Sequence, residues 1–435
     1  MTVTQEELGH RIRDAREACR MTQDAAAKHI GVSRPTFVQI EAGKRSVSSL
    51  ELDRLAYLFG RDIREFVANQ FPQEDALTAL FRAQASVVGE PEVLEKLRTC
   101  MALGRELTNL ERLVGIDRDL SAVASYPFPA PKARWEAVQQ GQRLAEEERR
   151  RLGLGFAPLP DMTELLESQG VRTAMVELPN DVSGLTLSDR KVGLFVVAND
   201  VHHYLRRRFS FAHEYAHVVA DRDRSGLISQ TSARDDLIEV RANAFAANFL
   251  MPEDGVRGFV AGLGKGRPSR IFAEVFDGEA ALRVEGRSEP GTQTIQLYDV
   301  VLLAHHFSVS RVSALYRLRN LRLLSEAEFN HLKALDDDGK GKPLARALGL
   351  SEPDHAEMRS EFKHRFLGLA LEAYRRDEIS RGKLRELVAM VGRSVDDLDQ
   401  RLDDAGFCGD APAPWARRST REQPLASQRT RGATH

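Results

Sequence analysis

The sequence predicts a mainly α-helical protein with a small α+β part. Three observations favour this fold class. Residues 8–67 repeat apolar side chains at helical spacing, residues 160–200 change to short strand-like runs, and residues 236–251 return to a long Ala-rich helical pattern. We therefore expect a helical bundle at the N-terminus, a central domain with a short antiparallel sheet beside helices, and a helical C-terminal region.

Composition sets the first limits on function. Apolar residues make up 42% of the chain and charged residues 29%, as in ordinary soluble proteins. No apolar run approaches the roughly 18 residues of a membrane helix, and the first residues lack a basic region followed by an apolar core. We therefore expect a cytoplasmic protein with no membrane partner. The formal net charge is −2, so any contact with nucleic acid must come from a local surface.

The cysteines exclude two kinds of site. Cys19, Cys100 and Cys408 are scattered along the chain, and no two of them form a Cys-x-x-Cys pair. This pattern supports neither a disulfide framework nor a zinc site built from cysteines.

Residues 8–67 predict a compact bundle. Thr22 is placed to cap a second helix, Gly31 suits a left-handed turn, and Ser33 is placed to cap the next helix, Arg34–Glu41. Later helices would close the core with four leucines, Leu50, Leu52, Leu55 and Leu58. Two helices joined by such a tight turn present the second helix to the major groove of DNA.

This segment resembles Xre/lambda-repressor-type helix-turn-helix domains, through Thr22-Gln23, Gly31-Val32-Ser33 and residues 40–45. The resemblance implies a homodimer on an operator of double-stranded DNA. It also implies a set of DNA-contacting residues: Gln23 on the phosphate backbone, Arg34, Thr36 and Gln39 toward the bases, and Lys44. Pro35 departs from the pattern because it cannot donate a hydrogen bond, so base specificity would depend on Arg34 and Gln39. The alternative is a helical domain that binds another protein.

A connector should follow the bundle. Its most periodic helical stretch is Glu92–Leu113, and three prolines in residues 126–131 interrupt the helical pattern. This break could be an exposed, extended segment that a protease can cut. After it, residues 135–153 read as a charged helix, and we interpret its charge run 146–151 as a solvated face.

The strongest chemical signal is the run His-Glu-Tyr-Ala-His at residues 213–217. On a helix, His213 and His217 share one face and can bind two corners of a tetrahedral zinc ion. Glu214, beside that face, can deprotonate a metal-bound water, which is the chemistry of peptide hydrolysis. By itself the pattern is also compatible with a helix that carries two ordinary surface histidines.

A second helix, residues 236–251, supports the metal interpretation. Glu239 can supply a third zinc ligand, and Asn243, four residues later, can hydrogen-bond a ligand. A solvated charge at the start of a helix is the alternative for Glu239.

Together, residues 208–214, 239–247 and 250–252 resemble the ImmA/IrrE family of intracellular zinc peptidases. The resemblance implies a zincin-like domain with zinc on His213, His217 and Glu239, Glu214 as general base, and Mn²⁺ as a further activating ion. It also implies a substrate class, because such peptidases cleave Xre-type repressors. His202, His203 and Tyr204 precede the helix, and each could donate to an oxyanion or have a structural role.

The domain organisation that we expect has seven segments. Three strands are expected at 171–178, 184–188 and 192–198. The segments are 1–70, the helix-turn-helix domain; 71–133, a helical connector; 134–262, the peptidase domain; 263–292, a flexible insertion; 293–350, a degenerate helix-turn-helix packed on the peptidase; 351–409, C-terminal helices; and 410–435, a disordered tail.

These features predict a DNA-binding transcriptional regulator fused to a zinc endopeptidase that inactivates an Xre-type repressor, either itself or a partner, in a stress, prophage or defence switch. Two alternatives remain open. The peptidase-like part could only sense a ligand or partner, or the chain could be the antitoxin or regulator of a toxin-antitoxin locus.

Overall fold

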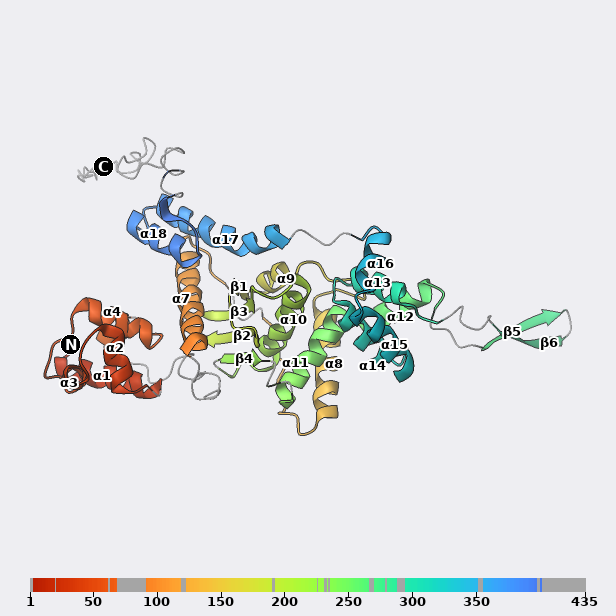
Figure 1. The fold of residues 1–435 in the computed structure, drawn as a ribbon, viewed down its shortest axis with the longest axis horizontal. Coiled ribbons are helices and arrows are strands. Elements are labelled where there is room, and N and C mark those ends of the chain that lie inside the picture. The colour runs from red at the N-terminus through yellow and green to blue at the C-terminus, as the bar shows by residue number, and fades with distance from the viewer. Residues whose placement is uncertain are drawn as a thin grey trace, which may run out of the picture. The chain divides into compact units, whose positions relative to one another are not determined.

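A computed structural model describes residues 3–400 except 20, 62, 69–90, 119–122, 190–191, 225, 231–232, 234, 266–269, 278–279, 288–293, 351–354 and 397–399. The chain divides into two compact units, Met1–Phe366 and Leu367–His435. The predicted fold class, mainly helical with a small sheet, is confirmed (Figure 1). Among the described residues, no helix is both long enough and apolar enough to span a bilayer.

The second and third helices of the N-terminal bundle have the caps and the turn that the sequence predicted. Thr22 accepts a hydrogen bond from the Ala25 amide, Gly31 has φ 75°, and Ser33 accepts from the Thr36 amide. The five helices are α1 (Gln5–Ala18), α2 (Gln23–Ile30), α3 (Arg34–Glu41), α4 (Ser49–Leu58) and α5 (Ile63–Val67).

One of the four leucines expected in this core lies outside it. Leu52, Leu55 and Leu58 are buried, whereas Leu50 is 73% exposed. Residues two positions apart on a helix point to nearly opposite sides, so Leu50 and Leu52 cannot both face the core. The prediction for Leu50 was therefore wrong.

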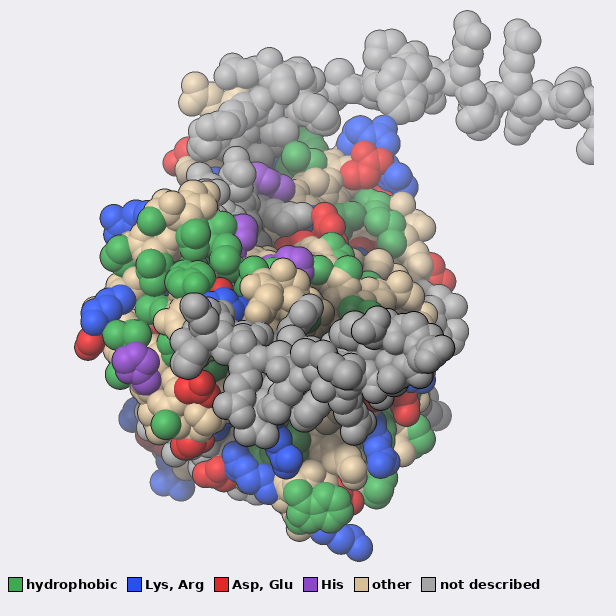
Figure 2. Space-filling view, turned by 90° about the vertical axis from the view of Figure 1, so that its right-hand side faces the viewer, with side chains coloured by type: hydrophobic (Ala, Val, Ile, Leu, Met, Phe, Trp, Pro, Cys, Tyr) green, Lys and Arg blue, Asp and Glu red, His purple; other side chains and the backbone are tan. Residues whose placement is uncertain are grey.

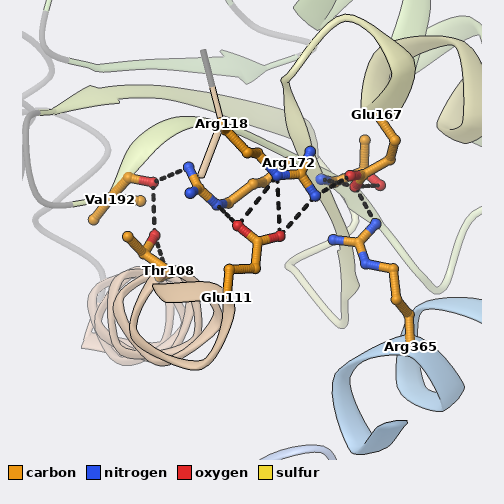
Figure 3. A network of polar contacts seen from close by, with 9 residues as sticks. Thr108, Glu111, Arg118, Glu167, Arg172, Val192 and Arg365 are labelled. Carbon is orange, nitrogen blue, oxygen red and sulfur yellow. Dashed lines mark hydrogen bonds and ion pairs between the residues drawn. The ribbon is translucent and has the colours of Figure 1, made fainter. Parts of the chain in front are cut away.

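Among the described residues of the connector is a long helix, α7 (Pro91–Leu113), whose C-terminal half contacts the central sheet. Glu111, which is buried, accepts hydrogen bonds from Arg172 at 2.7 Å and from Arg118 at 2.6 Å, as Figure 3 shows. Thr108 donates to the Val192 carbonyl at 3.0 Å. A buried carboxylate is stable only when it is paired, so these contacts fix the C-terminal half of α7 on the sheet.

The segment that interrupts the helical pattern is not free in solution. The Tyr126 amide donates to the Val219 carbonyl at 2.7 Å, and the Tyr126 hydroxyl donates to Glu148 at 2.8 Å. Pro131 is buried, while Pro127 and Pro129 are exposed. The expected absence of helix is confirmed, but the expected full exposure is wrong.

Helix α8 (Arg134–Arg151) follows this segment. Its charge run is only partly solvated, because Glu148 and Arg149 are buried. Glu148 also accepts from the Tyr215 hydroxyl at 2.5 Å, and Arg149 donates to the Phe249 carbonyl at 2.6 Å. These internal partners explain why two charges inside the run face the core.

The central sheet has the strand order β1-β3-β2-β4. Its strands are β1 (Arg172–Val176), β2 (Val182–Asp189), β3 (Gly193–Asn199) and β4 (Gly226–Gln230), and helix α9 (Met162–Ser168) precedes β1. Strands β1 and β3 are parallel and the other pairs are antiparallel, so the sheet is mixed and the purely antiparallel sheet was a wrong prediction. The sequence did not reveal β4.

Two helices complete the peptidase-like part. α10 (Tyr204–Ala220) packs on β2 and β3, and α11 (Leu237–Leu250) packs between α10 and α8. Gly141 of α8 permits a close approach, because a Cβ there would lie 2.3 Å from the Arg241 carbonyl oxygen of α11. A short helix, α12 (Glu253–Gly262), follows Pro252.

The remaining part of the first unit is helical apart from one hairpin. The expected flexible insertion contains β5 (Arg270–Asp277) paired with β6 (Ala280–Arg287). Then come α13 (Leu297–His306), α14 (Arg311–Asn320), α15 (Glu326–Asp337) and α16 (Gly341–Ala347), and buried side chains of α13 and α14 share one hydrophobic core with α10 and α11. On the face of the molecule shown in Figure 2, hydrophobic side chains gather at the upper left and basic side chains lie along the lower edge.

Two further helices, α17 (His355–Arg375) and α18 (Arg381–Met390), end the described part of the chain. The expected tail, 410–435, lies outside the described residues.

Candidate metal centre

The two histidines of α10 face the interior. His213 is 5% exposed and His217 is 1% exposed, because this side of α10 packs against the sheet and α11. A pair of ordinary surface histidines is therefore excluded.

The side chains of His213, His217 and Glu239 converge on one point. Their closest ligand atoms are separated by 3.1 Å (His213 Nε2 to Glu239 Oε2), 3.4 Å (His217 Nε2 to Glu239 Oε1) and 3.3 Å (between the two Nε2 atoms). Tetrahedral ligands about 2.0–2.1 Å from a shared zinc ion stand about 3.3 Å apart. The spacing of the donor atoms therefore fits such an ion.

The partners of the other ring nitrogens strengthen this fit. His213 Nδ1 lies 3.1 Å from Asn243 Oδ1, and His217 Nδ1 lies 3.0 Å from Asp221 Oδ2. Both partners are acceptors, so each Nδ1 carries the hydrogen, and each Nε2 of a neutral ring presents a lone pair. Two lone pairs and a carboxylate facing one another repel unless a cation or proton lies between them.

Asp221 and Arg241 extend the site and were not predicted from the sequence. Arg241 forms a buried ion pair with Asp221 and lies 3.4 Å from Gln140 Oε1. Although burial opposes it, the hydrogen bonds that His217 donates to the Asp221 and Glu239 carboxylates raise its pKa to about 10. Asp221 follows His217 by four residues and is the C-cap of α10, and this spacing was the signal that could have identified it.

Charge also perturbs the two carboxylates next to the histidines. Burial raises the pKa of Asp221 and of Glu239, but the hydrogen bonds from the imidazoles outweigh it and hold both pKa values below the usual range. Both groups are therefore anions that favour a positive charge between them.

Glu214 is buried next to the three converging side chains. Its side chain is 0% exposed, and burial raises the pKa of its carboxyl group. The Thr186 hydroxyl donates to Oε2 at 2.7 Å, while Oε1 has no hydrogen-bond partner among the described residues. An oxygen left free in this way can accept a proton.

The residues that precede α10 have structural partners. His202 Nε2 lies 3.1 Å from the Asn180 carbonyl oxygen, His203 caps α10 by accepting from the Leu205 amide, and Tyr204 packs on the His203 ring. These contacts favour the structural role over an oxyanion role.

On the N-terminal bundle, the expected DNA-contacting residues differ in availability. Arg34, Gln39 and Lys44 are exposed, and Thr36 is half-buried with its hydroxyl 2.8 Å from Ser33 Oγ. The Gln23 amide donates to the buried Glu41 carboxylate at 2.7 Å. Gln23 thus has a contact inside the domain that the sequence did not predict.

Comparison with known families matches the two parts of the chain separately. Residues 7–66 match a family model described as a helix-turn-helix domain. Residues 167–265 match the peptidase family M78 model, described as an IrrE N-terminal-like domain, and this range contains His213, Glu214, His217 and Glu239. No curated protein matches the chain. The chain therefore joins a DNA-binding helix-turn-helix domain to an IrrE-like peptidase-family domain.

Proposed function

We propose that the chain is a transcriptional regulator that binds operator DNA as a homodimer and carries a zinc-dependent endopeptidase, which inactivates an Xre-type repressor, either itself or a partner. The observation that carries this proposal is the buried convergence of two imidazoles and a carboxylate beside Glu214, in the same chain as a helix-turn-helix domain.

The side chains have separable roles in this proposal. His213, His217 and Glu239 would hold the ion, which would polarise a peptide carbonyl and make a water molecule more acidic. Glu214 Oε1, which has no hydrogen-bond partner among the described residues, would accept the proton of the attacking water and pass it to the leaving amine. Asn243 and Asp221 keep the two imidazoles in the tautomer that presents Nε2.

The two substrate routes differ in what they require. Self-cleavage in residues 126–131 requires release of the segment, because Tyr126 is hydrogen-bonded to Val219 and Glu148. Cleavage of a partner repressor requires no such release. The structure therefore favours a partner as the first substrate to test.

The test is metal content combined with cleavage. Purified protein should contain about one zinc per chain, and His217→Ala should lose it because one of three ligands is gone. Incubation with zinc or manganese, alone and with a purified Xre-type repressor, should produce fragments detectable by mass spectrometry. A His217→Ala protein that keeps its zinc would contradict the ligand assignment.

Glu214→Gln separates catalysis from sensing. The amide keeps the shape of the carboxylate but cannot accept the proton, so cleavage should stop while zinc and DNA binding remain. A wild-type protein that regulates DNA binding on zinc loading without ever cutting protein would favour the alternative, a peptidase-like sensor.

A further inference from the structure

The Glu214 carboxylate accepts a hydrogen bond from a residue of the central strand β2, Thr186. Thr186 of this strand lies in the interior of the sheet, opposite Val196 of β3 and Leu227 of β4. A residue paired on both sides has little freedom to move, and Thr186 is buried. Its hydroxyl is therefore a fixed point against which a neighbouring side chain can be positioned.

Thr186 contacts two atoms of the same glutamate. Its Oγ1 is 2.7 Å from Glu214 Oε2 and 3.2 Å from the Glu214 carbonyl oxygen. A hydroxyl has one hydrogen, and the shorter, charge-assisted bond to the carboxylate is the stronger of the two. The contact leaves Oε1 as the oxygen without a partner among the described residues.

Space for the carboxylate comes from a glycine on the same face of β2. Gly184 precedes Thr186 by two residues, so both face α10. A Cβ at position 184 would lie 2.9 Å from Glu214 Oε1 and 3.2 Å from its Cγ. Gly184 does not have a left-handed backbone, so the glycine is needed there for space.

We propose that Thr186 is a positioning residue that fixes Glu214 through Oε2 and thereby keeps Oε1, which has no hydrogen-bond partner among the described residues, available to take a proton. The inference rests on the proposed peptidase function and adds to it, because it separates an oxygen that anchors the general base from an oxygen that takes the proton. Without the hydroxyl, the buried carboxylate loses the hydrogen bond that Thr186 donates to Oε2 and with it a constraint on the position of Oε1.

The first experiment measures cleavage of fluorescein-labelled casein, a general protease substrate, by the zinc-loaded full chain. Thr186→Val should lower kcat about 10- to 100-fold with KM and zinc content unchanged, because a hydrogen bond to a charged group is lost. Thr186→Ser keeps the hydroxyl and should restore activity to near that of the wild type. Wild-type kcat in Thr186→Val would overturn the inference.

A matched control distinguishes positioning from general damage to the sheet. Thr173 is a buried threonine of β1 whose hydroxyl donates to Glu167 at 2.8 Å, away from the metal centre. Thr173→Val makes the same chemical change in the same sheet and should leave kcat unchanged. An equal fall in kcat for both variants would overturn the assignment to Thr186.

A second measurement does not depend on activity. The melting temperature of the zinc-loaded chain is measured for the wild type, Thr186→Val, Glu214→Leu and the double variant. Thr186→Val should lower the melting temperature less in the Glu214→Leu background than in the wild type, because the carboxylate that it contacts is already gone. The pair Thr173→Val and Glu214→Leu should be additive. If the wild type cleaves neither casein nor an Xre-type repressor, the proposed function fails. The comparison of melting temperatures still tests the contact, and additive effects of the Thr186 and Glu214 substitutions would overturn the inference whether or not the chain is a peptidase.

Discussion

At the scale of single residues, the orientation of the His217 imidazole is fixed by a chain of buried charged side chains. Asp221 accepts its Nδ1 hydrogen, and Arg241 forms an ion pair with the same carboxylate. All three side chains are buried, so the arrangement is rigid and costly to disrupt. Such partners of a metal ligand determine its orientation and its basicity.

Asp221→Asn should weaken zinc binding about 10- to 100-fold, because the amide gives a poorer acceptor for His217 Nδ1–H and leaves Arg241 without its anionic partner. Competition with a chromophoric chelator measures the affinity. Asp235→Asn is the control, because Asp235 is exposed and forms an exposed ion pair with Arg134. Unchanged zinc affinity in Asp221→Asn would remove Asp221 from the metal centre.

Zinc binding should release a proton at neutral pH. In the metal-free protein the pKa of His217 is raised to about 10 from about 6.5, so the stabilisation by its proton is complete below about 6.5 and is lost as pH rises through about 10. Zinc requires the unprotonated Nε2, so affinity should increase with pH up to that value. Calorimetry in buffers of different ionisation enthalpy counts the protons, and zero release at pH 7 would contradict this.

At the scale of elements, local patterns identified most helices but not the contacts between distant ones. The spacing in α10 and α11 predicted His213, His217 and Glu239, because these residues lie within short periodic segments. The parallel pair β1 and β3, the strand β4 and the inward-facing Glu148 depend on partners far away in sequence. Local periodicity contains no information about such partners.

The crossing of α8 and α11 gives a prediction at this scale. Gly141→Ala would place a methyl group against the Arg241 backbone and should destabilise the protein by about 1–3 kcal/mol. Because α11 carries Glu239 and Arg241, zinc affinity should fall as well.

Gly258→Ala is the control for this substitution. Gly258 lies in α12, and nothing stands within 4 Å of the position that its Cβ would take. Alanine should be neutral or slightly stabilising there, because it favours the helix over glycine. Equal melting temperatures for the Gly141 and Gly258 variants would show that the helices can separate without cost.

At the scale of the whole molecule, two domain matches occur in one chain without sharing residues. The helix-turn-helix match covers 7–66 and the peptidase-family match covers 167–265. Variants in one part should therefore leave the other intact, which makes each proposed activity testable in the full chain.

Arg34→Ala should weaken binding to operator DNA by about 1–3 kcal/mol and relax the preference at one base pair, since Arg34 is exposed at the start of α3 and can pair bidentately with guanine. Fluorescence anisotropy with operator and random duplexes measures both effects, and zinc content should not change. An equal loss on both duplexes would assign Arg34 to a phosphate instead.

The burial of the metal centre also affects how quickly an ion can leave it. His213, His217 and Glu239 are all buried, so an ion between them would meet solvent only through the coordination position that the proposed peptidase leaves open for water and peptide. Complete release of the ion also requires the three ligands to separate, and they belong to two helices, α10 and α11. Where this separation limits release, the rate of zinc loss becomes independent of EDTA at high concentration and measures how often α10 and α11 move apart.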